Sequence, residues 1–220
     1  MLTFAGIDLT SSPKKSSAYA LLGDDLRVHS LKSLSTDSEI IATVEHDRPK
    51  LVAIDAPLQK PLDLHCFNKE CSCPDPPHRA CESILRQEGI NIYFTTKRTF
   101  IKDMIERAIR LKGELESRGH NVIEVYPHAS KMRLWKDRAP QGKIPDKRKA
   151  AGRSFLREQF IEKIPNIEEY DNLKHDEYDA IIAAYTAYLL VHGNAECIGD
   201  SAGGYIVIPL KKDPASFRTD

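Results

Sequence analysis

Four aspartates stand where short apolar segments begin or end. Asp8 closes the first apolar run of the chain, and Asp55 closes the run LVAID. Asp176 and Asp179 are three residues apart, so on a helix they project from the same face. Carboxylate oxygens are the ligands that Mg²⁺ and Mn²⁺ prefer, and such an ion relieves the repulsion among convergent carboxylates. The pattern predicts a divalent-metal site made by these four aspartates, a kind of site that suits phosphodiester hydrolysis.

Each of these carboxylates also has a purely structural interpretation. Asp8 and Asp55 could end strands in turns or cap a loop. Asp176 could be a first-turn acid that the helix dipole stabilises. Asp179 precedes AIIAAYTAYLLV, a run so apolar that it must be buried. A carboxylate beside it needs a cation, so a salt bridge is the structural alternative to a metal ion.

Glu124 is a further candidate within the segment NVIEVY, close to Tyr126, Pro127 and His128. It could be an additional metal ligand, or it could orient His128 as a proton-transfer group. The alternative is a strand-end hydrogen bond to neighbouring backbone.

A cluster of thiols suggests a second kind of metal site. Cys66, Cys71, Cys73 and Cys81 follow the spacing Cys-x4-Cys-x-Cys-x7-Cys, which offers enough thiolates for a tetrahedral Zn²⁺ ion. Zinc would help to order this proline-rich stretch, which has little apolar content. The paired Cys-x2-Cys spacing of strong zinc motifs is missing, so reduced, unliganded cysteines are the alternative.

A basic strip lies between residues 131 and 157, with ten basic residues against two acids. Next to an acidic metal centre, such a strip would hold a nucleic-acid backbone. Arg153 and Arg157, one helical turn apart, could clamp a phosphate, and Trp135 could stack on a base. The alternative is a solvated face with a packed tryptophan. The candidate nucleic-acid contacts are Lys147, Lys149, Arg153, Arg157 and Trp135.

The elements that must position these residues alternate between strands and helices. The apolar run 51–55 is typical of a buried central strand, and the short turns among the first three strands indicate an antiparallel meander. Expected strands are 2–9, 18–22, 26–31, 51–55, 121–126 and 205–209. Expected helices are 37–46, 80–87, 100–118, 147–163 and 172–191. This order predicts a ribonuclease H-like α/β fold, a mixed sheet flanked by helices, with a Cys/Pro-rich insertion at about 56–98.

Length and composition indicate an ordinary globular protein. The 220 residues fit a single domain over 1–220. Basic and acidic residues number 32 each, so no global field directs the chain to nucleic acid or membrane. The longest apolar run, 180–191, is shorter than the ~20 residues of a membrane span. Five cysteines without a secretion signal indicate a reducing compartment, so we expect a cytoplasmic protein.

Five motifs resemble a known family, the uncharacterised prokaryotic proteins described as predicted nucleases of ribonuclease H fold. The motifs are GlyIleAspLeu (6–9), AlaIleAspAlaProLeu (53–58), GluValTyrProHis (124–128), GlyArg-x3-Arg (152–157) and HisAsp-x2-AspAla (175–180). ArgAlaCysGlu (79–82) resembles a further family element, Arg-x-Cys-acid. That family is distantly similar to the Holliday-junction resolvases, and the resemblance implies a possible homodimer. It also implies that Asp8 bridges two metal ions, that Asp55 holds one of them, and that Asp176 with Asp179 holds the other.

We therefore expect a Mg²⁺- or Mn²⁺-dependent nuclease acting on DNA or RNA. One rival is a nucleic-acid-binding or scaffold protein of the same fold that does not cleave. Another is a phosphate-handling relative of the actin-like ATPases. The turn after Asp8, ThrSerSerProLysLys, lacks the glycines with which phosphate loops approach their ligand, so this rival is less favoured.

Overall fold

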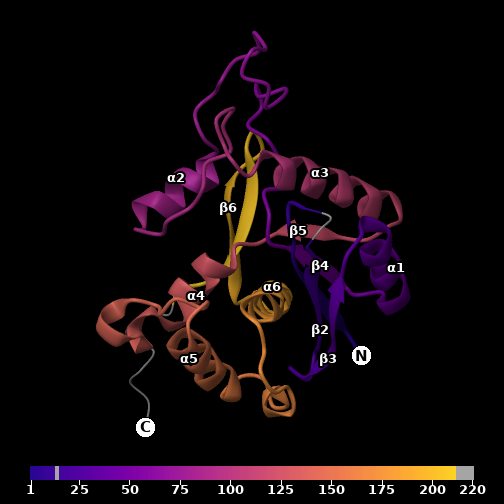
Figure 1. Ribbon diagram of the computed structural model, residues 1–220, viewed down its shortest axis with the longest axis vertical. Helices are drawn as coiled ribbons and strands as arrows, with labels where there is room; N and C mark the ends of the chain where they lie inside the picture. Colours follow the sequence, from indigo (N-terminus) through magenta and orange to yellow (C-terminus); the bar gives the residue numbers. More distant parts are fainter. Residues whose placement is uncertain (13–14, 212–220) are drawn as a thin grey trace.

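The computed structural model describes residues 1–12 and 15–211, so the turn after Asp8 falls partly outside the described ranges (Figure 1). Its main sheet has five strands in the order β3-β2-β1-β4-β5. The strands are β1 (Thr3–Asp8), β2 (Ser17–Gly23), β3 (Val28–Leu34), β4 (Leu51–Ile54) and β5 (Val122–Glu124).

The pairing within this sheet is mixed. Strands β1, β2 and β3 form an antiparallel meander, and β4 and β5 are added in parallel to the other side of β1. The parallel additions place the ends of β1 and β4 at the same edge of the sheet. Element order and pairing confirm the predicted ribonuclease H-like fold.

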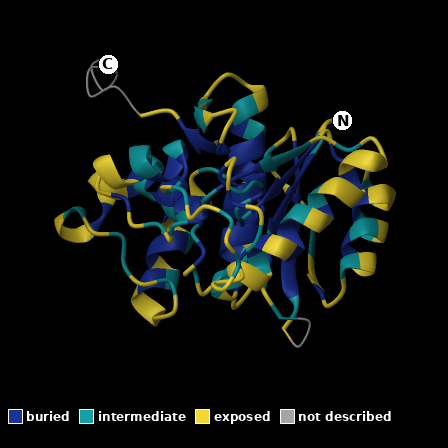
Figure 2. Ribbon diagram, turned by 90° about the horizontal axis from the view of Figure 1, so that it is seen from above, coloured by how far each residue is buried: buried dark blue, intermediate teal, exposed yellow. Residues whose placement is uncertain are grey.

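Helices cover both faces of the sheet (Figures 1 and 2). One face packs against α1 (Asp37–Asp47) and α3 (Lys102–Ser117), where Ile7 and Ile54 meet Ile40 and Leu111. The other face packs against α6 (His175–Val191), the most buried helix. Next to α6 lie α4 (Pro127–Trp135) and α5 (Ala150–Ile161). Alternate residues of the central strands thus face two separate cores, as the period of two requires.

Gly6 allows α6 to lie directly on the centre of β1. A Cβ atom added to Gly6 would overlap the carbonyl oxygen of Ala180 and the amide nitrogen of Ala184. Only a residue without a side chain permits this approach. The contact brings the first turn of α6 beside the end of β1.

The structure also differs from the expected elements. Between β5 and α5 the chain forms α4, where we expected a basic stretch without a helix. The expected strand 205–209 exists as β7 (Gly204–Pro209), but it pairs with an unexpected strand, β6 (Ala195–Asp200), in a separate two-stranded sheet. The insertion contains one helix, α2 (Ala80–Gln87), at the expected position. No helix within the described ranges is long and apolar enough to cross a membrane.

Candidate metal centre

Three separate segments deliver the predicted aspartates to one edge of the sheet. Asp8 is the last residue of β1, and Asp55 follows β4, where its amide donates a hydrogen bond to the carbonyl of Ile7 (2.9 Å). Asp176 and Asp179 lie in the first turns of α6, which can pack close to β1 because Gly6 has no side chain. The strand ends and the helix therefore meet where ligands bind in open α/β sheets.

Electrostatics show that Asp8, Asp55 and Asp176 are neighbours. Burial raises the pKa of Asp8 well above its ordinary value, and the carboxylates of Asp55 and Asp176 raise it further. Burial also raises the pKa of Asp55 to about 6, although two lysines oppose the shift. Both carboxyl groups are thus held where their charged forms are disfavoured.

The side chains of two lysines lie among these aspartates. The Nζ atom of Lys131, from α4, lies 2.9 Å from Oδ1 of Asp179, and Nζ of Lys147 contacts Oδ2. Asp179 is only 2% exposed, so this double ion pair provides the cation that its burial requires. Burial lowers the pKa of Lys131 to about 8, and it lowers the pKa of Lys147 as well.

The charges of this group fit a divalent cation. Four carboxylates and two ammonium groups leave a formal charge of −2 when all are ionised. Among the described residues, Asp179 is the one member of the four that forms an ion pair with a lysine. The other three offer hard oxygen atoms, which suit Mg²⁺ or Mn²⁺. No three of the described carboxylates place one oxygen each within 4.8 Å of one another, so binding would require them to draw closer.

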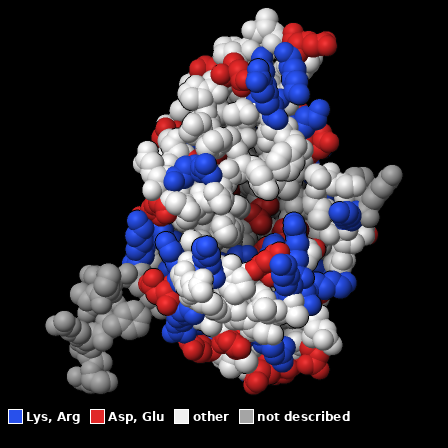
Figure 3. Space-filling view, turned by 60° about the vertical axis from the view of Figure 1, so that its left-hand side comes forward, with Lys and Arg blue, Asp and Glu red and all other residues white. Residues whose placement is uncertain are grey.

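A pocket of about 350 Å³ opens beside the aspartates. In Figure 3, acidic atoms are recessed in a hollow of the surface that basic side chains border. Burial and the charges of Lys131 and Lys147 lower the pKa of His128 to about 4, so its imidazole is neutral near pH 7. The lining includes Asp55, Tyr93, Tyr126, His128, Lys131, Lys147, Arg148 and Asp179.

Tyr93 and Lys131 are site residues that the sequence did not single out. Tyr93 is 59% exposed at this pocket, and its ring meets Phe100 edge to face at 4.7 Å. Nothing in the sequence distinguishes Tyr93 from other loop aromatics. Lys131 is one of ten basic residues in the strip, and only its place on the buried side of α4 sets it apart.

Glu124 faces a different partner from those we expected. Its Oε1 accepts from Nη2 of Arg79 at 2.7 Å, and its Oε2 accepts from Nη1 of Arg79 at 2.8 Å and from the amide of Leu58 at 2.7 Å. Arg79 is fully buried and also pairs with Glu82 at 2.9 Å. Both oxygens of Glu124 are thus used, so the expected roles as metal ligand and as partner of His128 are corrected to a structural one.

The basic strip divides into parts with different roles. Trp135 is 2% exposed and packs edge to face against Phe160, so the expectation that it stacks on a base is wrong. The guanidinium groups of Arg153 and Arg157 donate to different backbone carbonyls, those of Arg148 and Tyr170, and so do not form a common clamp. Lys147 lies in the pocket, whereas Lys149 is exposed at the start of α5.

Of the four cysteines proposed as zinc ligands, three lie together and the fourth lies elsewhere. The Sγ atoms of Cys66, Cys71 and Cys73 lie within 4.8 Å of one another. Cys81 is instead fully buried in α2, packed against Leu85 and Ile198. The proposed zinc site is therefore corrected from four cysteines to three, because Cys81, in the first turn of α2, points into a hydrophobic core.

Comparisons with known proteins place the chain in a family. No curated protein matches the sequence. Among solved structures, RuvC of T. thermophilus in complex with a Holliday junction substrate is similar to this chain, with 14% sequence identity and a TM-score of 0.48. The superposition covers 89% of this chain and 99% of the RuvC chain. The family described as "Protein of unknown function (DUF429)" matches residues 6–203, a range that contains every motif of the resemblance given above. The chain therefore belongs to this family of proteins of unknown function.

Proposed function

We propose that this protein is a divalent-metal-dependent nuclease that hydrolyses phosphodiester bonds of nucleic acids. The observation that carries the proposal is the meeting of Asp8, Asp55 and Asp176 at one sheet edge with their charge only partly balanced. These three carboxylates would hold Mg²⁺ or Mn²⁺. When bound, such an ion supplies an acidified water and stabilises charge on phosphate oxygens.

The lysines and Asp179 act together in this proposal. Asp179 holds the ammonium groups of Lys131 and Lys147 beside the proposed ligands, as its ion pairs to both of them indicate. Cations held in this way can attract a phosphodiester into a pocket that would otherwise repel it. In this proposal Asp179 positions the two lysines, a role that replaces the expected one as a metal ligand together with Asp176.

The remaining pocket residues suit a nucleotide. Arg148 lines the pocket and supplies a guanidinium group, the side chain that matches phosphate geometry best. The exposed ring of Tyr93 offers a face on which a base can stack. Neutral His128 can accept a hydrogen bond from a water molecule in the pocket.

One observation favours a second candidate, a nucleic-acid-binding protein that does not cleave. Lys131 and Lys147 already neutralise Asp179, so the site could be complete with lysines as its only cations. In that protein the basic pocket would bind phosphates without any metal ion. The two candidates differ in whether divalent ions change the outcome.

The test is cleavage of a mixed panel of single-stranded, duplex and branched DNA and RNA with Mg²⁺, with Mn²⁺ or with chelator. Asp8→Asn keeps the shape of the side chain and removes its charge, so it should abolish metal-dependent cleavage while binding persists. Asp63→Asn, at an exposed aspartate of the insertion, is the matched control and should cleave like the wild type.

Three outcomes would contradict the proposal. Wild-type protein that binds the panel and cleaves nothing favours the second candidate. Hydrolysis of ATP in place of nucleic acid favours the actin-like alternative. Cleavage that survives Asp8→Asn would come from a contaminating nuclease.

A further inference from the structure

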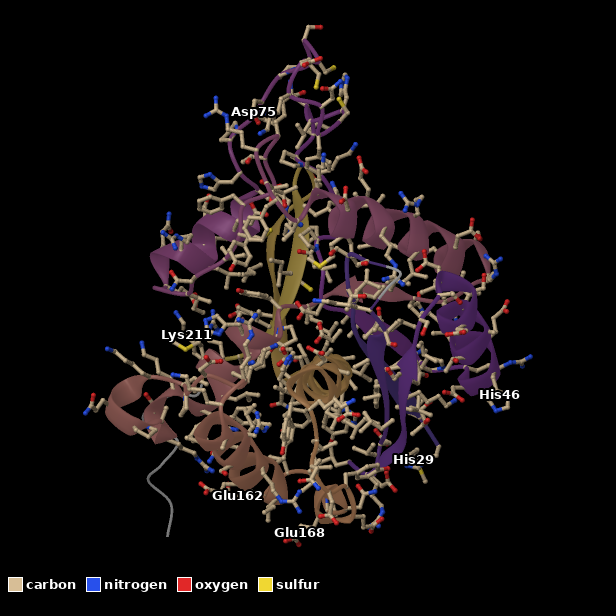
Figure 4. All side chains as sticks on the ribbon, in the orientation of Figure 1. His29, His46, Asp75, Glu162, Glu168 and Lys211 are labelled. Carbon is tan, nitrogen blue, oxygen red and sulfur yellow. The ribbon has the colours of Figure 1, made fainter. Side chains whose placement is uncertain are left out.

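Three thiols meet in the loop of the insertion that follows β4. The Sγ atoms of Cys66, Cys71 and Cys73 all lie within 4.8 Å of one another. In Figure 4 sulfur atoms gather in the loop that carries the labelled Asp75, at one end of the molecule. None of the three is in a disulfide bond.

The spacing of these sulfurs matches thiolate coordination. Sγ of Cys66 and Sγ of Cys73 are 3.9 Å apart. Two sulfurs bound at ~2.3 Å to a tetrahedral zinc ion are separated by ~3.8 Å. A disulfide would instead require ~2.05 Å. The sulfurs thus stand where they could share one ion without a large movement of the backbone.

The loop around them has little else to hold it. Between β4 and α2 the described chain has no helix or strand, and its last buried anchor before Arg79 is Phe67, which packs with Leu64 and Ile105. No residue from 68 to 78, all of them described, is buried. A segment that buries no side chains cannot offset the conformational entropy that it loses when it becomes ordered. In such segments a bound metal ion commonly supplies the stabilising free energy instead.

Lys97 supports the same geometry from outside the loop. The residue is 8% exposed, and its Nζ donates to the carbonyl of Cys71 at 2.8 Å and to the carbonyl of Cys73. Its amide donates to Oδ1 of Asp75 at 3.1 Å. The ammonium group therefore fixes the backbone of two of the cysteines. It also places one positive charge beside them, which would balance the net charge of −1 of Zn²⁺ with three thiolates.

We propose that Cys66, Cys71 and Cys73 bind one Zn²⁺ ion, which orders the tip of the insertion. Soft thiolates select zinc over Mg²⁺ and Mn²⁺, so the protein would hold different metals at its two sites. Among the described residues no fourth Cys, His, Asp or Glu joins the three sulfurs, so a water molecule would complete the tetrahedron. This inference does not depend on the proposed nuclease activity.

The first experiment measures zinc by elemental analysis in full-length protein purified under reducing conditions without chelator. Wild type should carry about one zinc per chain. Cys71→Ser with Cys73→Ser should carry almost none, whereas Cys197→Ser, at an exposed cysteine outside the cluster, should keep its zinc. His65→Ala should also keep it, because His65 is not among the three ligands.

Two further readouts separate coordination from misfolding. Replacement of zinc by Co²⁺ should give the absorption bands of thiolate-bound cobalt in wild type and in Cys197→Ser, but not in the double variant. Chelator should expose residues 68–78 of wild type to protease while the rest of the chain stays resistant. Wild type that takes up no zinc when supplied with the ion would overturn the proposal. So would full zinc content in the double variant, or a Cys66–Cys73 disulfide in freshly prepared reduced extract.

Discussion

Asp55→Asn should stabilise the metal-free protein near neutral pH, although it removes a proposed metal ligand. Asp55 has a pKa of about 6 in the folded protein, whereas an unfolded aspartate titrates at ~3.9. The folded state therefore holds the proton of Asp55 more tightly than the unfolded state does. The stability associated with that proton is complete below about pH 4 and is lost as the pH rises through about 6.

The size of the effect follows from the difference in pKa. Two pKa units correspond to roughly 3 kcal/mol, since each unit is worth ~1.4 kcal/mol. Asparagine resembles the protonated aspartate, so wild type and Asp55→Asn should have similar free energies of unfolding near pH 4. Above about pH 7 the variant should be more stable by up to about 3 kcal/mol.

Urea unfolding with chelator, followed at several values between about pH 4 and about pH 8, measures this difference directly. Asp63→Asn, measured in parallel, removes a charge outside the site and should show no such trend. Mn²⁺ at about 1,000 times its Kd should reverse the order, because it stabilises wild type by ~4.1 kcal/mol and a variant that lacks a ligand by much less. If Asp55→Asn is destabilising above pH 7 without metal, then Lys131 and Lys147 already satisfy Asp55, and the site has no unbalanced charge for a cation.

Three further changes test how the site is built. Gly6→Ala should destabilise the protein by about 1–3 kcal/mol or more and weaken Mn²⁺ binding, because the new Cβ overlaps α6. The control in thermal unfolding is Gly113→Ala, where an added Cβ meets no other atom and the protein should not be destabilised. Arg79→Met leaves Glu82 and Glu124 buried without their cation and should cost about 3–5 kcal/mol in urea unfolding; a loss below about 1 kcal/mol would refute the structural role of Arg79. Tyr93→Ala should weaken single-strand binding by about 1–3 kcal/mol with little change in melting temperature; unchanged affinity would exclude base stacking.

The strongly patterned parts of the fold could be predicted from the sequence. The apolar segment at 51–54 forms β4, the insertion helix runs over Ala80–Gln87 as expected, and the helix expected at 37–46 forms α1 (Asp37–Asp47). The strand β6, AECIGD, was missed because it contains two acids and a glycine and is partly exposed. Tertiary pairing with β7, and not local propensity, makes it a strand.

The site was predictable only where the pattern is local. Strand ends and the 176/179 spacing located the aspartates, but the pairing of Asp179 with Lys131 depends on α4, a helix that begins with Pro127 inside a segment without clear periodicity. The same helix ends on Trp135 and carries it into the core. Glu124 could not be assigned because its partner, Arg79, lies 45 residues away. Contacts over such distances are set by packing that one sequence does not reveal.

The most direct test of the central claim is a crystal structure of the protein with Mn²⁺, with the ion located by its anomalous scattering. The proposed site predicts a manganese ion bound by carboxylate oxygens of Asp8, Asp55 and Asp176 at ~2.0–2.6 Å, with Lys131 and Lys147 still on Asp179. In crystals of Asp8→Asn the signal should be lost or strongly reduced while the fold is unchanged. Crystals of wild type soaked in Mn²⁺ that show no ion among these aspartates, with the lysines filling the space instead, would contradict the account.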